Sequence, residues 1–250
     1  MVGIDLTGKT AIITGAGRGL GLATAQRLYA AGANVAINEY DDPSGENHTQ
    51  AEQAATDLGD RAAVVMADVR DTDAIEVMVD NVAARFGGLD IVVNNAAILR
   101  DRTLKKMSAT EWQSVIDTNL TGVFNVCKAG TAAMRDGGRI VNLASISAVI
   151  GFFGQTNYAA AKAGVIGLTR SLSREVGARQ ITVNAVAPGV ALTDMGLTIP
   201  ENVREEMLKS IPLGRFAEPR EIADVIVFLC SDLASHVSGQ VIHVNGGWWG

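Results

Sequence analysis

The sequence predicts a doubly wound α/β fold, in which helices cover both faces of a parallel sheet, and three observations support this. Short β-branched runs alternate with longer helical segments along all 250 residues. Several runs are apolar at every position, as in Ile91-Val92-Val93, which is expected of strands covered on both sides. No repeat, low-complexity tract or block of like charge interrupts the alternation. We therefore expect one domain, residues 1–250, built from right-handed crossovers.

Each element is expected where its pattern begins. Strands are expected at Thr10–Thr14, Asn34–Glu39, Ala63–Ala67, Ile91–Asn94, Arg139–Ala144, Ile181–Ala185 and Gln240–Val244. Helices are expected to start near Leu20, Glu46, Thr72, Ala109, Thr156 and Pro219. Gly32 suits the position after the first helix, and Pro219 suits the first position of the last. The segment Leu192–Gly214 carries two prolines and several charges, so it is expected as a surface excursion or as a substrate lid.

Composition narrows the class of protein. A formal net charge of −6 disfavours nucleic acid and anionic membrane as partners. Residues 1–8 lack the features of a signal peptide, and no apolar run reaches the roughly 20 residues of a membrane span. Cys127 and Cys230 are expected as reduced, buried thiols, which favours the cytoplasm. The three histidines are scattered, so no metal site is expected.

A glycine-rich turn directly follows the first strand and opens a helix. Glycine permits a tight turn and a close approach of backbone N–H groups to a pyrophosphate, and the helix N-terminus favours the negative charge. The turn therefore predicts a dinucleotide site formed by Gly15, Gly17, Arg18, Gly19, Leu20 and Gly21.

Glu39 ends the second strand, 20 residues after Gly19. A carboxylate there accepts hydrogen bonds from both adenosine ribose hydroxyls and repels a 2′-phosphate. Arg18 acts in the opposite sense, because a guanidinium pairs well with that phosphate. We weight the carboxylate more, so NAD is favoured and NADP remains the alternative. Asp68 and Val69, after the third strand, are expected beside the adenine, or Asp68 caps the next helix.

Tyr158 and Lys162 are four residues apart in a helix expected from Thr156 to Val176, so they share one face. Tyrosine has a reference pKa of about 10 and is a poor acid at neutral pH. A neighbouring ammonium favours the phenolate and draws this pKa down. The pair therefore suggests acid–base catalysis, with Tyr158 as proton donor or acceptor.

Two further polar residues are expected to meet this pair. Ser145 follows the fifth strand, and its hydroxyl is suited to bind a substrate oxygen that gains negative charge. Ser147 is the alternative for that role. Asn119, expected within the helix Glu111–Asn125, is a candidate to hold a water that links Lys162 to solvent, or a structural amide.

Together these residues resemble the short-chain dehydrogenase/reductase superfamily over essentially the whole chain. The matching motifs are Thr14-Gly15-x-x-x-Gly19-x-Gly21, Asn94-Asn95-Ala96, Asn119, Ser145, Tyr158-x-x-x-Lys162 and Pro188-Gly189-x-x-x-Thr193. The resemblance implies a single Rossmann-like domain with a seven-stranded parallel sheet in the order 3-2-1-4-5-6-7. It implies a catalytic tetrad of Asn119, Ser145, Tyr158 and Lys162, with Lys162 also binding nicotinamide-ribose hydroxyls. The residues that the resemblance places along the cofactor are Asn95, Ala96, Pro188, Gly189, Val190 and Thr193.

The resemblance also has consequences for the reaction and for assembly. It implies hydride transfer between nicotinamide and a secondary alcohol or ketone, with no metal. The segments Ile98–Thr103 and Val244–Trp249 look like 3-oxoacyl-thioester reductases and hydroxyacyl-CoA dehydrogenase modules. A homotetramer is implied, built on helices expected at Ala109–Met134 and Tyr158–Val176. The family's usual Asn-Asn-Ala-Gly ends in Ala97 here, and its extra methyl group is expected to shift the backbone beside the cofactor.

A second class of function uses the same fold. A dinucleotide-binding module without catalysis would serve as a redox sensor or a scaffold. Such a module has no use for Ser145 or Tyr158, so the tetrad favours the enzyme. The sequence does not identify the small-molecule substrate, because the segments expected around the pocket carry no readable chemical code.

Overall fold

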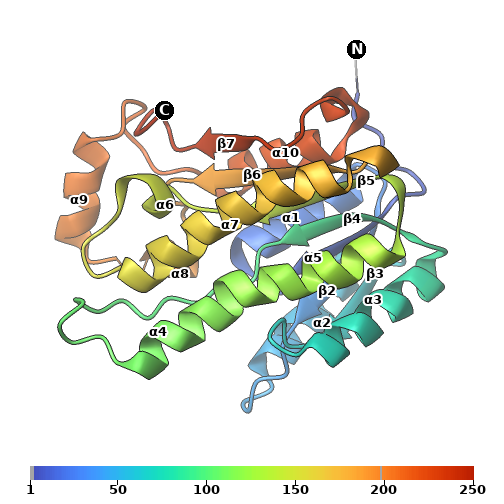
Figure 1. The fold of residues 1–250 in the computed structure, drawn as a ribbon, viewed down its shortest axis with the longest axis horizontal. Helices are drawn as coiled ribbons and strands as arrows, with labels where there is room; N and C mark the ends of the chain where they lie inside the picture. Colours follow the sequence, from blue (N-terminus) through green and yellow to red (C-terminus); the bar gives the residue numbers. More distant parts are fainter. Residues whose placement is uncertain (1–2, 198) are drawn as a thin grey trace.

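The computed structural model describes residues 3–197 and 199–250 and contains one seven-stranded parallel sheet. The strand order is β3-β2-β1-β4-β5-β6-β7, which confirms the expected topology (Figure 1). The strands are β1 (Thr10–Thr14), β2 (Asn34–Glu39), β3 (Ala62–Met66), β4 (Leu89–Asn94), β5 (Met134–Leu143), β6 (Thr182–Pro188) and β7 (Val241–Val244). The order reverses beside β1, where the chain crosses from β3 to β4. A sheet of this kind opens a crevice at such a point, outside the carboxyl ends of its strands.

The six helices that the sequence predicts begin at or next to the expected residues. The described residues form ten α-helices in all. They are α1 (Gly19–Ala30), α2 (Glu46–Leu58), α3 (Thr72–Phe86), α4 (Ala109–Ile116), α5 (Gly122–Ala133), α6 (Ser147–Ile150), α7 (Thr156–Glu175), α8 (Asp194–Leu197), α9 (Glu201–Lys209) and α10 (Pro219–Cys230). Pro219 occupies the first turn of α10, and Gly32 has a φ of +104° just after α1, as the sequence predicts. No helix in the two described ranges is both long and apolar enough to cross a membrane.

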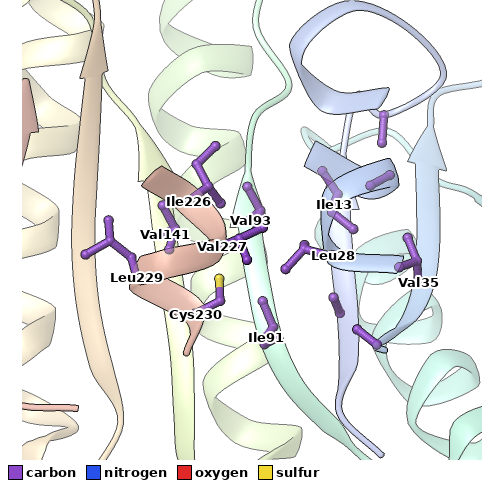
Figure 2. Packing of buried hydrophobic residues seen from close by; sticks show 14 of the residues in the cluster. Ile13, Leu28, Val35, Ile91, Val93, Val141, Ile226, Val227, Leu229 and Cys230 are labelled. Carbon is purple, nitrogen blue, oxygen red and sulfur yellow. The ribbon is translucent and has the colours of Figure 1, made fainter. Parts of the chain in front are cut away.

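Two apolar cores lie on opposite faces of the sheet. Ala11 and Ile13 of β1 point into one core, which α1, α2 and α10 cover. Ile12 points into the other core, which α3, α5 and α7 cover. Figure 2 shows the first core, where Leu28 and Ile226 reach the sheet from two helices. Because successive side chains of a strand point to opposite faces, the apolar runs of the sequence feed both cores at once.

Two expectations about helices need correction. The continuous helix expected at Ala109–Met134 is divided by a π-helical turn at Asp117–Thr121, where the Gly122 N–H donates to the Asp117 carbonyl five residues earlier. The segment 192–214, in which the sequence shows no element, contains α8 and α9. α9 is short and buries none of its side chains, so it lacks the long apolar face that reveals a helix in a sequence.

Candidate active site

The glycine-rich turn between β1 and α1 depends on glycine at three positions. Gly15 and Gly19 have φ values of +61° and +57°, in the left-handed region that glycine adopts without steric cost. Gly21 has an ordinary φ, but a Cβ atom there would lie 2.2 Å from the Gly15 carbonyl oxygen. Glycine at this position therefore lets the start of α1 pack against the turn.

Asn95 fastens the turn to the end of β4. Its amide Nδ2 donates to the carbonyl oxygens of Thr14 and Gly15, both at 2.9 Å. The Thr14 hydroxyl oxygen accepts the backbone N–H groups of Asn95 and Ala96 at 3.0 Å each. Asn95 and Ala96 thus lie against the turn. Thr14 is missing from the predicted site residues, although its place beside Gly15 is a signal that could have indicated it.

Glu39 reaches the turn from the end of β2. Its side-chain Oε1 accepts the Gly17 N–H at 3.0 Å, and the residue is only 9% exposed. Burial raises the pKa of Glu39, while the Gly17 N–H and the charge of exposed Arg18 act to lower it. The carboxylate therefore lies where an adenosine ribose would meet the end of β2, and the Gly17 hydrogen bond favours its charged form.

Asp68 and Val69 follow β3 beside this position, and the Ala67 N–H donates to the Glu39 carbonyl at 2.8 Å. The Asp68 carboxylate pairs with the Arg70 guanidinium, whose hydrogen bonds hold the pKa of Asp68 below its usual value. The cap of α3 is Asp71 and not Asp68, because Asp71 accepts the first free N–H groups of that helix. Val69 is buried, and its carbonyl accepts the Asn125 amide at 2.9 Å.

Tyr158 and Lys162 lie in the first turns of α7, next to Ser145, which follows β5. The Ser145 hydroxyl lies near the Tyr158 hydroxyl and acts to lower the pKa of Tyr158. The Lys162 ammonium is 5.7 Å from the centre of the Tyr158 ring and donates to the Leu143 carbonyl oxygen at 2.6 Å. Lys162 is 2% exposed. The structure therefore brings three of the four predicted catalytic residues together at the end of β5.

The pKa of Tyr158 differs from the sequence-based expectation. Burial raises the pKa of Tyr158 to about 12, the Ser145 hydrogen bond lowers it, and the charge of Asp101 raises it. Burial also lowers the pKa of Lys162 to about 8. The predicted lowering of the tyrosine pKa by Lys162 is therefore wrong for the protein alone: the lysine is itself disfavoured as a cation, and the lowering contribution comes from Ser145.

Ser147, the alternative to Ser145, has its hydroxyl engaged elsewhere. It donates to Oε1 of Gln155 at 2.8 Å, and Nε2 of Gln155 donates to the Asp101 carboxylate at 2.8 Å. The Ser147 N–H donates to Oγ of Ser145 at 3.1 Å. Ser147 therefore holds the Ser145 side chain in place, and Ser145 is the serine that meets Tyr158.

Asn119 is fully buried in the π-helical turn. Its Nδ2 donates to the Ile98 carbonyl and its Oδ1 accepts the Ile98 N–H, both at 2.9 Å. One donor and one acceptor of the side-chain amide thus hold the segment after β4. Single π-helical turns within α-helices are frequent at functional sites.

The segment after β6 returns to the glycine-rich turn. The Pro188 carbonyl accepts the Ile146 N–H at 2.9 Å, and the Gly189 N–H donates to the Val244 carbonyl at 3.0 Å. The Val190 carbonyl accepts the Ala217 N–H at 3.1 Å. Side-chain carbons of Thr193 lie 3.7 Å from the place of a Cβ atom on Gly19. Residues predicted from opposite ends of the chain therefore meet across the carboxyl edge of the sheet.

These contacts define a class of protein. The turn offers backbone N–H groups at the start of α1, a buried carboxylate stands at the end of β2, and no Cβ atom fills the close approach at Gly21. A dinucleotide fits this cradle, and a Ser–Tyr hydroxyl pair beside a buried lysine lies farther along the same edge. The fold and the site are those of a dinucleotide-dependent oxidoreductase.

Comparison with known proteins agrees with this class. Residues 15–249 match the family adh_short_C2, described as enoyl-(acyl carrier protein) reductase. A 3-oxoacyl-[acyl-carrier-protein] reductase FabG of Staphylococcus aureus is 45% identical over 246 residues, covering 96% of this chain and 98% of its own. A FabG of Chlamydia trachomatis is 43% identical over 244 residues, covering 97% and 98%.

Solved structures match equally well. A short-chain dehydrogenase/reductase from Brucella melitensis, titled glucose/ribitol dehydrogenase, superposes with a TM-score of 0.94 at 35% identity over 100% of both chains. A dehydrogenase/reductase from Sinorhizobium meliloti gives a TM-score of 0.91 at 33% identity, covering 99% of this chain and 97% of its own. The chain belongs to the short-chain dehydrogenase/reductase family. It is an oxidoreductase that transfers a hydride between a nicotinamide cofactor and a ketone or secondary alcohol of a small-molecule substrate.

Proposed function

We propose that the enzyme reduces the 3-keto group of 3-oxoacyl thioesters. The neighbouring hydroxyls of Ser145 and Tyr158 carry this proposal, because two donors that lie close together suit one oxygen that gains negative charge. A ketone oxygen is such an atom. The relatives named as 3-oxoacyl reductases extend over nearly the whole chain, which supports the thioester as the substrate class.

The chain's own residues divide the work as follows. Bound nicotinamide supplies or accepts the hydride. Ser145 binds the substrate oxygen, and Tyr158 donates its proton to that oxygen in reduction or removes it in oxidation. Lys162 binds the nicotinamide-ribose hydroxyls, and Asn119 holds the segment around Ile98 that borders the pocket. The raised pKa of Tyr158 keeps the phenol protonated until a ligand changes its surroundings, which suits a proton donor.

The proposed cofactor is NAD, with NADP as the alternative. The buried Glu39 carboxylate supports NAD, because a 2′-phosphate placed beside it would be repelled. Exposed Arg18 in the turn is the feature that favours NADP. The residues proposed to contact the dinucleotide are Gly15, Gly17, Arg18, Gly19, Leu20, Gly21, Glu39, Asp68, Val69, Asn95, Ala96, Tyr158, Lys162, Pro188, Gly189, Val190 and Thr193.

We also propose that residues 192–214 act as a substrate lid. The segment is tied at both ends, since the Leu192 N–H donates to the Ala217 carbonyl and the Leu213 N–H to the Gly246 carbonyl, at 2.9 and 3.1 Å. Between these ties, α9 buries no side chain. A segment with few buried side chains opens more easily than the core around it.

The assembly and the compartment complete the proposal. We propose a homotetramer that packs through α4, α5 and α7, on which Trp112 and Phe124 are 38% and 52% exposed. The proposed compartment is the cytoplasm, which agrees with the two free thiols of Cys127 and Cys230.

Replacement of Tyr158 by phenylalanine tests the reaction. We expect Tyr158→Phe to bind NADH as the wild type does and to lose turnover of 3-oxoacyl thioesters by roughly a hundredfold to ten-thousandfold. Binding is measured by fluorescence titration and turnover by the absorbance of reduced nicotinamide. Tyr29→Phe removes a hydroxyl far from Ser145 and is the matched control. Wild-type turnover in Tyr158→Phe would contradict the mechanism, and absence of turnover in the wild type would favour a non-catalytic dinucleotide-binding sensor.

A further inference from the structure

A basic segment lies between β4 and α4. Residues 100–106 contain four cations, Arg100, Arg102, Lys105 and Lys106, and one carboxylate, Asp101, in a chain whose net charge is −6. All five of these side chains belong to exposed residues. The hydride-transfer site uses none of the four cations. A local cationic surface on an otherwise acidic protein attracts anionic groups to that place.

Backbone and side-chain contacts attach this basic segment to the residues just before Tyr158. The Arg102 N–H donates to the Gly154 carbonyl at 2.9 Å, and the Asn157 amide donates to the Arg100 carbonyl at 3.0 Å. The basic segment therefore borders the mouth of the candidate active site. Figure 1 shows the β4–α4 connection on the same side of the molecule as α6, α8 and α9, where the carboxyl ends of the strands point.

The four cations differ in how they are engaged. Nε of Arg102 pairs with Glu111 at 3.1 Å, and the Arg100 guanidinium donates to the Leu99 carbonyl at 2.8 Å. Within the described residues, the ammonium groups of Lys105 and Lys106 form neither an ion pair nor a hydrogen bond. The backbone that carries them is ordered, because the N–H groups of Lys106 and Met107 both donate to the Thr103 carbonyl. Two neighbouring cations are thus held at the pocket mouth without a carboxylate partner.

We propose that Lys105 and Lys106 bind the phosphate of the phosphopantetheine arm that carries the thioester substrate. This inference rests on the proposed function. When the 3-keto group meets Ser145 and Tyr158, the arm leads outward and ends in a phosphate, which is common to coenzyme A and to acyl carrier proteins. Lysine ammonium groups are good phosphate partners, and their attraction acts on the carrier end of the substrate while the chemistry takes place at the keto end.

Two substrates that differ by one phosphate test the inference. Kinetics are measured with acetoacetyl-4′-phosphopantetheine and with acetoacetyl-pantetheine, for the wild type and for Lys105→Ala/Lys106→Ala. We expect KM for the phosphorylated substrate to rise about threefold to tenfold in the variant, with kcat unchanged, and KM for pantetheine to stay the same. In the wild type, added salt should raise KM only for the phosphorylated substrate, and this difference should vanish in the variant.

Two control variants test whether the effect on KM is specific to Lys105 and Lys106. Arg85→Ala/Arg174→Ala removes two exposed cations from α3 and from the far end of α7, and should leave both KM values unchanged. Leu104→Ala changes the same loop without changing its charge and should behave likewise. Equal KM changes for both substrates in the lysine variant, or no change for either, would overturn the inference.

Further measurements identify the carrier of the phosphate and distinguish failure of the inference from failure of the proposed function. Acetoacetyl-CoA and an acetoacetyl carrier protein should both show the lysine effect, since both contain the phosphate. An effect on the carrier protein alone would assign the lysines to its acidic surface and would overturn the inference. If the wild type reduces neither pantetheine substrate nor either carrier thioester, the proposed function fails. If pantetheine is reduced and the lysines have no effect, only the inference fails.

Discussion

Glu39 combines burial with a single strong hydrogen bond, and this combination sets the expected cofactor preference. Its carboxylate is 9% exposed and is satisfied by the Gly17 N–H at 3.0 Å. A 2′-phosphate placed there would meet a negative charge with little water to screen it. We expect Glu39→Ala to raise the ratio of kcat/KM for NADPH to that for NADH by about tenfold.

The control for this prediction is Asp41→Ala, which removes an exposed carboxylate two residues farther along the chain. It should leave the ratio unchanged. An unchanged ratio in Glu39→Ala would mean that the carboxylate does not meet the ribose.

Lys162 makes the stability of the cofactor-free protein depend on pH. Burial lowers the pKa of Lys162 from 10.5 to about 8, so above pH 8 the folded protein releases a proton that the unfolded chain retains. The unfolded state then binds more protons, and the free energy of unfolding rises with pH in this window. We expect it to rise relative to Lys162→Met by up to about 1.4 kcal/mol per pH unit.

Urea unfolding between pH 8 and 10 measures this difference. The upper limit of pH 10 limits the contribution of Tyr158. Burial raises the pKa of Tyr158 from 10.0 to about 12, so above pH 10 the unfolded chain loses this proton first and the free energy of unfolding decreases. Parallel profiles for the wild type and Lys162→Met would contradict the lowered lysine pKa.

At the scale of elements, the turn between β1 and α1 tolerates no side chain at Gly21. A Cβ atom there would lie 2.2 Å from the Gly15 carbonyl and 2.6 Å from Nδ2 of Asn95. The turn and its tie to β4 would both have to move. We expect Gly21→Ala to lower stability by about 1–3 kcal/mol and to weaken NADH binding at least tenfold.

Thermal unfolding and NADH titration check these two effects. Gly177→Ala is the matched control, because nothing lies within 4 Å of a Cβ atom at that position. Wild-type affinity in Gly21→Ala would show that the turn adapts without losing its shape.

The elements also show what a sequence reveals and what it leaves hidden. All seven strands lie where their apolar runs predict, since burial on both faces leaves a continuous signal. Their ends are less certain: β5 begins at Met134 and β6 continues to Pro188, because pairing with a neighbouring strand and not local composition decides where a strand stops. The helix α9 is short and has no buried side chain, so its few apolar residues do not indicate a helix.

The candidate site shows the same limit. Gly15, Glu39 and Tyr158 lie at strand or helix ends, and their spacing predicts that they meet at one edge of the sheet. The engagement of Asn119 with Ile98 could not be predicted, because it depends on a π-helical turn for which the sequence has no marker. Likewise, the raised pKa of Tyr158 follows from three-dimensional burial, which spacing along a helix does not report.

At the scale of the whole molecule, α4 and α5 present apolar side chains that this chain does not cover. Phe124 on α5 is 52% exposed and Trp112 on α4 is 38% exposed, on the helices through which we propose that subunits pack. A charge introduced at Phe124 would have to be buried in that interface, which is costly without a partner. We therefore expect Phe124→Glu to sediment as a smaller species than the wild type, which should sediment as a tetramer.

Analytical ultracentrifugation measures the outcome, and Val77→Glu is its control. Val77 lies on α3 and is 59% exposed, so the substitution adds the same charge to a comparably exposed apolar position outside the proposed interface. Val77→Glu should keep the mass of the wild-type assembly. Because Phe124 lies close in sequence to the π-helical turn that carries Asn119, turnover of the smaller species would also report whether assembly supports the site. A tetramer that persists in Phe124→Glu would exclude α5 from the interface.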